Sequence, residues 1–142
     1  MPLIGTTEFF KGIDLIPFEG RDSDNPLAFK FYEADRLVGG KPMREHFKFA
    51  VAYWHSFCGT GADPFGPGTL LHPWDIPSDP MDAARLKADA AFEFITKLGF
   101  DYFCFHDFDL VREVPTLEES EQRLSEIVSY VKEKMEGSGG KL

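Results

Sequence analysis

The sequence predicts an α/β fold, in which two parallel βα units follow an irregular N-terminal arm. This prediction rests on the order of the elements, because two short apolar runs typical of strands are each followed by a stretch of helical periodicity. The chain has 142 residues, 43% of them hydrophobic and 27% charged, which is the balance of a single globular domain. We therefore divide it into an arm over residues 1–46 and a βα region over residues 47–142.

The composition argues against several classes of function. A net charge of −9 opposes binding to a phosphate backbone, so we expect no nucleic-acid partner. The chain has no run of about 18 apolar residues, and residues 1–11 lack a basic region followed by an apolar one. We therefore expect neither a membrane span nor a signal peptide. Cys58 and Cys104 are too few for a disulfide framework and suit a reducing compartment, which predicts a cytoplasmic protein.

The first third of the chain is predicted to be an irregular arm that leads into a single strand. Turns are expected at residues 22–26 and at Gly39-Gly40, and a short helical turn at residues 42–46. Residues 47–54 are aromatic and apolar with one charge, which predicts a strand buried on both faces, with a buried helical turn as the alternative. Residues 59–80 are rich in glycine and proline, and a loop of this length is usually functional or disordered.

The first helix has clear signals at both of its ends. Asp79 is a cap candidate and Pro80 follows it in the first turn, after which apolar residues recur at helical spacing. Gly99 lies where a left-handed residue ends many helices, so the helix is predicted over residues 81–98. Residues 102–105 follow at once as a short aromatic run, which predicts a second buried strand.

The second helix is predicted to begin after Thr116, which can form a capping box with Glu119. Its apolar stripe continues to Met135, and residues 137–140 are expected to stop it, which leaves Lys141-Leu142. Two βα units neither close a barrel nor protect the edges of an open sheet. We therefore expect the chain to be incomplete as a fold.

Reactive side chains are concentrated in residues 105–109, directly after the second predicted strand. In parallel βα architectures the active site lies at this end of the strands. Asp109 follows His106 by three residues, so its carboxylate can turn back and accept the imidazole N–H, which fixes the tautomer. Such a pair can move a proton to or from a hydroxyl near neutral pH. The alternative is a structural histidine, with Asp107 and Asp109 as turn or cap residues.

Two aromatic residues each have two possible uses. Phe65 is at the tip of a tight turn over residues 63–66, and an aromatic residue in such a place most often packs into its own core. Trp54 suits a flat apolar wall beside a sugar ring, and core packing is its more common use. The other three histidines show no metal-ligand spacing, and no glycine-rich phosphate loop follows a strand.

Four segments carry a resemblance to a known family. They are Asn25-Pro26-Leu27-Ala28-Phe29, Phe49-Ala50-Val51-Ala52-Tyr53-Trp54-His55, Ala62-Asp63-Pro64-Phe65-Gly66 and Tyr102-Phe103-Cys104-Phe105-His106-Asp107-Phe108-Asp109. Together they resemble xylose isomerase, of the class with the longer N-terminal extension. The resemblance runs through essentially the whole chain, and its F-H-D-x-D element combined with the D-P-F-G loop is specific.

This resemblance implies a fold, an activity and cofactors. The fold is a (β/α)8 TIM barrel, of which this chain supplies the arm and the first two βα units, about a third of a family chain. The activity is the interconversion of the aldose D-xylose and the ketose D-xylulose, and more slowly of D-glucose and D-fructose. The cofactors are two divalent ions, Mg2+, Mn2+ or Co2+.

The resemblance also implies roles for single residues. His106 matches a histidine that contacts the sugar ring oxygen and assists ring opening, and Asp109 matches the aspartate that orients it. Trp54 matches a tryptophan that lines the sugar pocket. Phe65 matches a phenylalanine that reaches across a subunit interface into a neighbouring active site, which would overturn the core-packing prediction for it.

The chain departs from the family in one large respect. The family's metal ligands lie on later strands that this chain lacks, so we expect no tight metal site in it and impaired or absent turnover. Its open strand edges and apolar helix faces predict a homo-oligomer rather than a monomer. The alternative function is a non-catalytic, self-associating module that binds sugar or has a structural role. A related sugar epimerase or isomerase is a weaker alternative, because several separate motifs match xylose isomerase.

Overall fold

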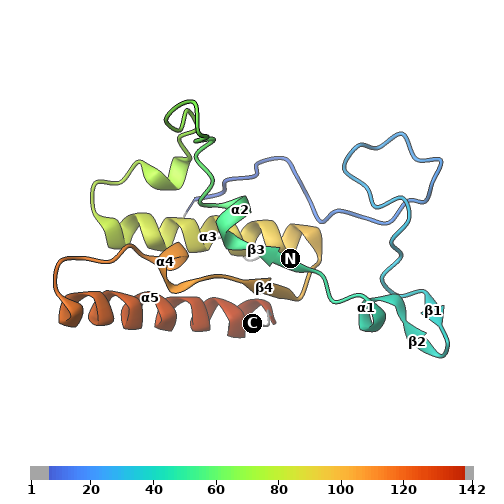
Figure 1. Cartoon of the computed structure of the whole chain (residues 1–142). Helices are drawn as coiled ribbons and strands as arrows, with labels where there is room; N and C mark the ends of the chain where they lie inside the picture. The colour runs from blue at the N-terminus through green and yellow to red at the C-terminus, as the bar shows by residue number, and fades with distance from the viewer. Residues whose placement is uncertain (1–6, 140–142) are drawn as a thin grey trace.

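Two strands pair in parallel at the centre of the molecule, β3 (Ala50–Ala52) and β4 (Tyr102–Cys104) (Figure 1). Their register places Val51 opposite Phe103. The computed structural model describes residues 7–139, so the predictions for residues 1–6 and for Gly140-Lys141-Leu142 lie outside the described residues. A parallel pair needs a crossover, and here the long loop and helix α3 (Pro80–Leu98) supply it. The predicted α/β order of the elements is therefore confirmed.

Helices α3 and α5 (Leu117–Ser138) have the ends that their sequences predict. The Asp79 carboxylate accepts hydrogen bonds from the first turn of α3, and Gly99 ends that helix at φ 69°. The Thr116 hydroxyl accepts from the amide of Glu119 at the start of α5. Helix α5 runs two residues further than expected, because Gly139 rather than Gly137 takes the left-handed conformation.

The core lies between one face of the small sheet and the two long helices. Val51 and Phe103 point into it, and the ring of Phe92 on α3 meets Phe103 edge to face at 5.2 Å between centroids. Ile127 and Val131 of α5 close the core from the other helix. Each fully buried side chain of this size contributes about 1.5–3 kcal/mol, so this layer is the main source of stability.

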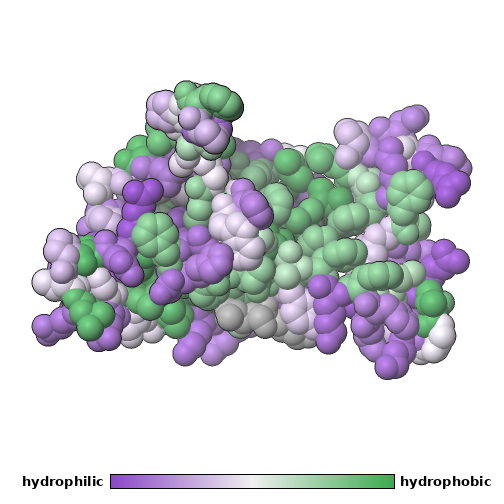
Figure 2. Space-filling view, viewed as in Figure 1, coloured by the Kyte–Doolittle hydropathy of each residue, from purple (hydrophilic) through white to green (hydrophobic). Residues whose placement is uncertain are grey.

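The prediction of one strand over residues 47–54, buried on both faces, is wrong. Only Ala50–Ala52 forms a strand, and a helical turn, α2 (Tyr53–Ser56), follows directly, so the alternative holds for the second half. Phe47 and Phe49 remain 54% and 44% exposed. Both residues precede the three-residue strand, and Phe49 packs on Tyr32 and Phe100 outside the main core. The helices cover the face of the sheet that carries Val51, while the opposite face has no covering layer among the described residues. Figure 2 shows the resulting broad hydrophobic region in the middle of this view.

The arm contains more order than its sequence indicates. The predicted helical turn is α1 (Met43–His46), and the predicted turn at Gly39-Gly40 joins two short antiparallel strands, β1 (Leu37–Val38) and β2 (Lys41–Pro42). Both glycines have positive φ, 58° and 82°, which suits the twist of a two-residue hairpin. In Figure 1 the first part of the arm runs beside α3, where the Ile16 amide donates to the Lys97 carbonyl, while the part with β1, β2 and α1 projects away from the long helices.

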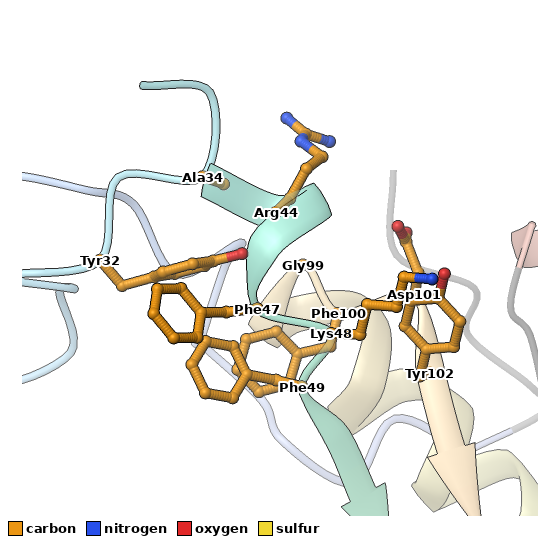
Figure 3. Close-up of a pocket in the computed structure, with 10 residues that line it drawn as sticks. All are labelled: Tyr32, Ala34, Arg44, Phe47, Lys48, Phe49, Gly99, Phe100, Asp101 and Tyr102. Carbon is orange, nitrogen blue, oxygen red and sulfur yellow. The ribbon is translucent and has the colours of Figure 1, made fainter. Parts of the chain in front are cut away.

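Aromatic rings attach the arm to the amino-terminal end of the sheet (Figure 3). Phe49 stacks on Phe47 at 6.1 Å and on Phe100 at 5.6 Å between centroids, and Tyr32 meets Phe49 edge to face at 5.0 Å. Phe29 of the arm stacks on Phe100 as well. These contacts join the arm to the residues that directly precede β3 and β4.

The long loop is partly ordered by a short 3-10 helix, η1 (Pro73–Asp75). It buries Trp74, whose indole N–H donates to the carbonyl of Phe57 at 2.9 Å. No helix within residues 7–139 has both the length and the apolar character that a membrane crossing needs. The described residues form two small sheets and no closed barrel.

Candidate active site

The carboxyl ends of β3 and β4 bring His106 and Trp54 together. His106 lies between the end of β4 and the one-turn helix α4 (Asp107–Leu110), and Trp54 is the second residue of α2, two residues after the end of β3. The carboxyl ends of neighbouring parallel strands meet at one edge of the sheet, which explains this proximity. The ring centroids of Trp54 and His106 are 4.7 Å apart, with 44° between their planes. The sequence predicts Trp54 at the end of a strand, but in the structure it lies in α2.

The expected hydrogen bond between His106 and Asp109 is present. The imidazole Nδ1 is 3.0 Å from the Asp109 Oδ2, and the same oxygen accepts the backbone N–H of His106 at 2.8 Å. Asp109 thus bonds to the ring and also caps the turn. The catalytic use of the pair stays a prediction. The imidazole is 66% exposed and the carboxylate only 9%, which leaves the far edge of the ring accessible.

This geometry defines which nitrogen can take up a proton. A carboxylate only accepts hydrogen bonds, so Nδ1 of His106 carries the hydrogen when it bonds to Asp109. The Nε2 of a neutral ring then has its lone pair free for a hydroxyl proton. The half-buried indole of Trp54 forms a flat wall beside this position. The arrangement therefore suits proton transfer with a hydroxyl that lies against an apolar surface.

Phe65 stands apart from these residues. Its side chain is 95% exposed, at the tip of a turn closed by paired backbone hydrogen bonds between Asp63 and Gly66. The Asp63 carboxylate also accepts the amide of Phe65 at 2.8 Å, which stiffens the turn. The expectation that this ring packs into its own core is therefore wrong. Its role in a neighbouring subunit stays a prediction.

Two residues that the sequence analysis did not select also meet Asp109. The ammonium group of Lys87 on α3 donates to the backbone carbonyl of Asp109 at 2.7 Å, and the Cys58 thiol approaches the same oxygen at 3.6 Å. Burial raises the pKa of Cys58, and the nearby Lys87 opposes this only in part. Both residues line a cleft of about 560 Å³.

A signal for Lys87 exists in the sequence. It lies three residues after Ala84 and four before Ala91, so it shares a helix face with two residues of the predicted apolar stripe. A lysine within an apolar stripe needs a partner for its ammonium group once the helix packs. Cys58 has no comparable signal, because its partner is 51 residues away.

A divalent cation does not fit the described residues. Within residues 7–139, no three His, Cys, Asp or Glu side chains converge in a way that could hold a metal ion. In the His106–Asp109 pair, Nδ1 and Oδ2 are already bonded to each other.

The sequence of the chain is similar to that of several known proteins. It is 56% identical over 139 residues to "Xylose isomerase 2" of Xanthomonas campestris pv. campestris (strain 8004), which covers 98% of this chain and 31% of that protein. It is 55% identical over the same share of the chain to "Xylose isomerase 1" of Xanthomonas axonopodis pv. citri (strain 306) and to "Xylose isomerase" of Xanthomonas oryzae pv. oryzae (strain MAFF 311018).

These matches have a definite extent. The chain spans 31–32% of the length of these relatives, and no family model matches it. The quoted motifs lie within a similarity that extends over nearly the whole chain, so they are not isolated coincidences. The predicted resemblance is therefore confirmed, and the chain corresponds in sequence to about a third of a xylose isomerase.

Proposed function

We propose that this chain carries the ring-opening part of an aldose–ketose isomerase site, with D-xylose as the substrate and D-glucose as a slower one. The observation that carries the proposal is the exposed His106 imidazole, held at Nδ1 by Asp109 and flanked by the indole of Trp54. The names of the relatives give the substrate class. The pair of βα units then forms the first part of a (β/α)8 barrel, with the helices on its outside and the uncovered sheet face inside.

Ring opening needs one proton removed and one added. Nε2 of His106 accepts the proton of the sugar O1 hydroxyl while the bond between C1 and the ring oxygen breaks. The electron pair of that bond goes to the ring oxygen, which then takes the proton from Nε2 and becomes a hydroxyl. Asp109 stabilises the imidazolium that forms between the two steps. Trp54 offers an apolar face to the sugar carbons.

The hydride shift that completes isomerisation belongs to another part of the site. The resemblance implies two divalent ions, Mg2+, Mn2+ or Co2+, which would act as Lewis acids on the open-chain sugar. The described residues of this chain offer no such ligand set, so the ions require residues beyond them. Acid–base help alone gives rate factors of about 10² to 10⁴, which suits ring opening and falls short of full turnover.

Mutarotation tests the proposal without any metal. Freshly dissolved α-D-xylose opens and recloses to its equilibrium mixture, and polarimetry follows the rate. We expect the chain to accelerate mutarotation in a chelating buffer. In the His106→Asn variant, the catalysed rate should be about 10²-fold lower. His46→Asn is the control, because His46 lies in α1 of the arm and its ring contacts the carbonyl of Val38. Equal rates for the chain and His106→Asn would contradict the proposal.

A second candidate function is a non-catalytic module that associates with itself. The observation in its favour is the number of large apolar side chains that remain exposed, Phe65, Leu71, Phe108 and Leu117 among them. A chain that binds D-xylose or forms oligomers, and that leaves mutarotation unchanged, would have this function. The polarimetric experiment therefore separates the two candidates.

A further inference from the structure

The backbone carbonyl of Asp109 is the meeting point of three segments of the chain. It lies in the last turn of α4, where carbonyl groups have no partner within the helix. Lys87 reaches it from α3 with a charged hydrogen bond of 2.7 Å, and the Cys58 thiol reaches it from the residues after α2 at 3.6 Å. A charged donor at this distance is much the stronger of the two.

The same residue holds His106 through its side chain. The Asp109 carboxylate accepts two hydrogen bonds from His106, one from its backbone N–H and one from its Nδ1–H. In return, the Asp109 amide donates to the His106 carbonyl at 2.9 Å. Three hydrogen bonds therefore join these two residues. Helix α4 is only four residues long and has one turn of its own hydrogen bonds. A single turn is not stable by itself, so its position depends on contacts from outside.

We infer that Lys87 is a positioning residue for the His106–Asp109 pair. By fixing the main chain of Asp109 to α3, it keeps the carboxylate on Nδ1 of His106 and so holds the neutral ring in the Nδ1–H tautomer. The value of that tautomer for ring opening rests on the proposed function, because only then does Nε2 face a sugar hydroxyl. The positioning itself is a property of the chain and does not depend on any turnover.

Helix α3 is a suitable anchor for this purpose. It has 19 residues, and its Ala88, Ala91 and Phe92, close to Lys87, are fully buried. The lysine stem is half-buried, so its ammonium group has few alternative positions. The interaction therefore connects the single turn after β4 to a helix whose neighbouring side chains are buried in the core.

The test reads the tautomer directly. Ring nitrogen chemical shifts of 15N-labelled chain distinguish Nδ1–H from Nε2–H, and His106→Asn identifies the signal of His106 among the four histidines. At about pH 8.5, where an ordinary imidazole is neutral, we expect about a tenfold excess of Nδ1–H in the unaltered chain. Lys87→Met keeps the stem and removes the donor, and it should reverse this excess. Lys87→Arg should keep it, and Cys58→Ala should leave it unchanged.

The outcomes separate positioning from a purely structural role. If Lys87→Met lowers the melting temperature and His106 remains Nδ1–H, the inference is overturned. If Lys87→Met does not fold, the unaltered chain decides, because the Lys87 ammonium protons must exchange with water more slowly than those of the exposed Lys132. Equal exchange overturns the inference too. A correct tautomer pattern without accelerated mutarotation would uphold the inference and contradict the proposed function.

Discussion

Tyr53 sits at the junction of β3 and α2 with its side chain almost completely buried. Its ring packs edge to face on Phe57 at 5.1 Å and on Phe105 at 5.9 Å between centroids. Its hydroxyl has no hydrogen-bond partner within residues 7–139. Burial, followed by the nearby Cys58 and Asp89, raises the pKa of this phenol far above its ordinary value. The hydroxyl therefore costs stability instead of adding it.

We expect Tyr53→Phe to stabilise the chain. The substitution keeps the ring and removes an unpartnered buried hydroxyl, which costs about 1–3 kcal/mol. Urea unfolding should show a higher midpoint with an unchanged slope. Tyr130→Phe is the matched control, because the hydroxyl of Tyr130 donates to Asp89 at 2.7 Å and its loss should lower the midpoint. A lower midpoint for Tyr53→Phe would show that the hydroxyl has a partner in solution.

Glu93 and Lys97 form a buried ion pair that fastens residues 8–10 to α3. The Glu93 carboxylate accepts from Lys97 at 2.7 Å and from the amides of Phe9 and Phe10. Lys97 donates in addition to Glu8 and to the Phe10 carbonyl. Burial alone would raise the pKa of Glu93, but the bonds from Lys97 and the two amides outweigh it, so this pKa lies below its ordinary value.

This lowered pKa gives the pair a defined dependence on pH. A carboxyl group whose pKa is lower in the folded chain adds stability above the ordinary pKa of 4.5, and that stability is lost as the pH falls below it. We expect Glu93→Gln to cost about 3 kcal/mol at pH 7, because Lys97 loses its buried counter-charge. Urea midpoints between pH 3 and pH 7, at about one-unit steps, should fall less steeply for Glu93→Gln than for the unaltered chain. The double variant Glu93→Gln/Lys97→Met should recover part of the stability that Glu93→Gln loses. If Glu93→Gln and the unaltered chain had the same pH profile, the ion pair would not cause the pH dependence.

At the scale of single elements, α3 depends on its amino-terminal cap. The Asp79 carboxylate accepts from the amides of Met81 and Asp82, both at 2.9 Å, and Pro80 removes one amide that has no partner there. We expect Asp79→Ala to lower the free energy of unfolding by about 1 kcal/mol, measured by urea titration. Ser78→Ala, one residue earlier and exposed, should change it by less than about 0.5 kcal/mol. If Asp79→Ala and Ser78→Ala lower the free energy of unfolding equally, the Asp79 cap does not stabilise α3.

The two long helices could be predicted from the sequence because their signals are local. Helix α3 has its cap, its apolar spacing and its terminal glycine within about twenty residues, and α5 has the same set. The extent of β3 could not be predicted from its own residues, because it depends on how many residues of β4 are available for pairing. Here β4 offers only three residues for pairing, and the chain turns into α2 directly afterwards.

The candidate site divides in the same way. The hydrogen bond between His106 and Asp109 spans three residues, so their spacing was enough to predict it. The contact of Lys87 with the Asp109 carbonyl spans 22 residues and depends on how α3 packs against the sheet. The preference of aromatic residues for burial favours a core position for Phe65, but its side chain is exposed, because such preferences are averages over folds. The intersubunit role that the resemblance implies for Phe65 stays a prediction.

At the scale of the whole molecule, one face of the sheet has no covering layer among the described residues. Ala50 is exposed, and Ala52, Tyr102 and Cys104 are only half-buried on this side, while Val51 and Phe103 are buried on the other. Figure 2 shows that hydrophobic residues dominate the middle of the molecule in this view. Among the described residues this sheet consists of β3 and β4 alone, so each of these strands also has a free edge. Water contact with such a surface is unfavourable, and contact with a second chain would reduce it.

We therefore expect this chain to form dimers or larger oligomers at micromolar concentration. Light scattering coupled to gel filtration should give at least twice the chain mass of 16.1 kDa. Ala50→Lys places a charge at the end of β3, on the exposed side, and should shift the equilibrium towards the monomer because a buried lysine needs a partner. Ser125→Lys adds the same charge to an exposed position of α5 and should leave the mass unchanged. A sharp monomer peak of the unaltered chain would mean that its apolar surfaces are covered within a single chain.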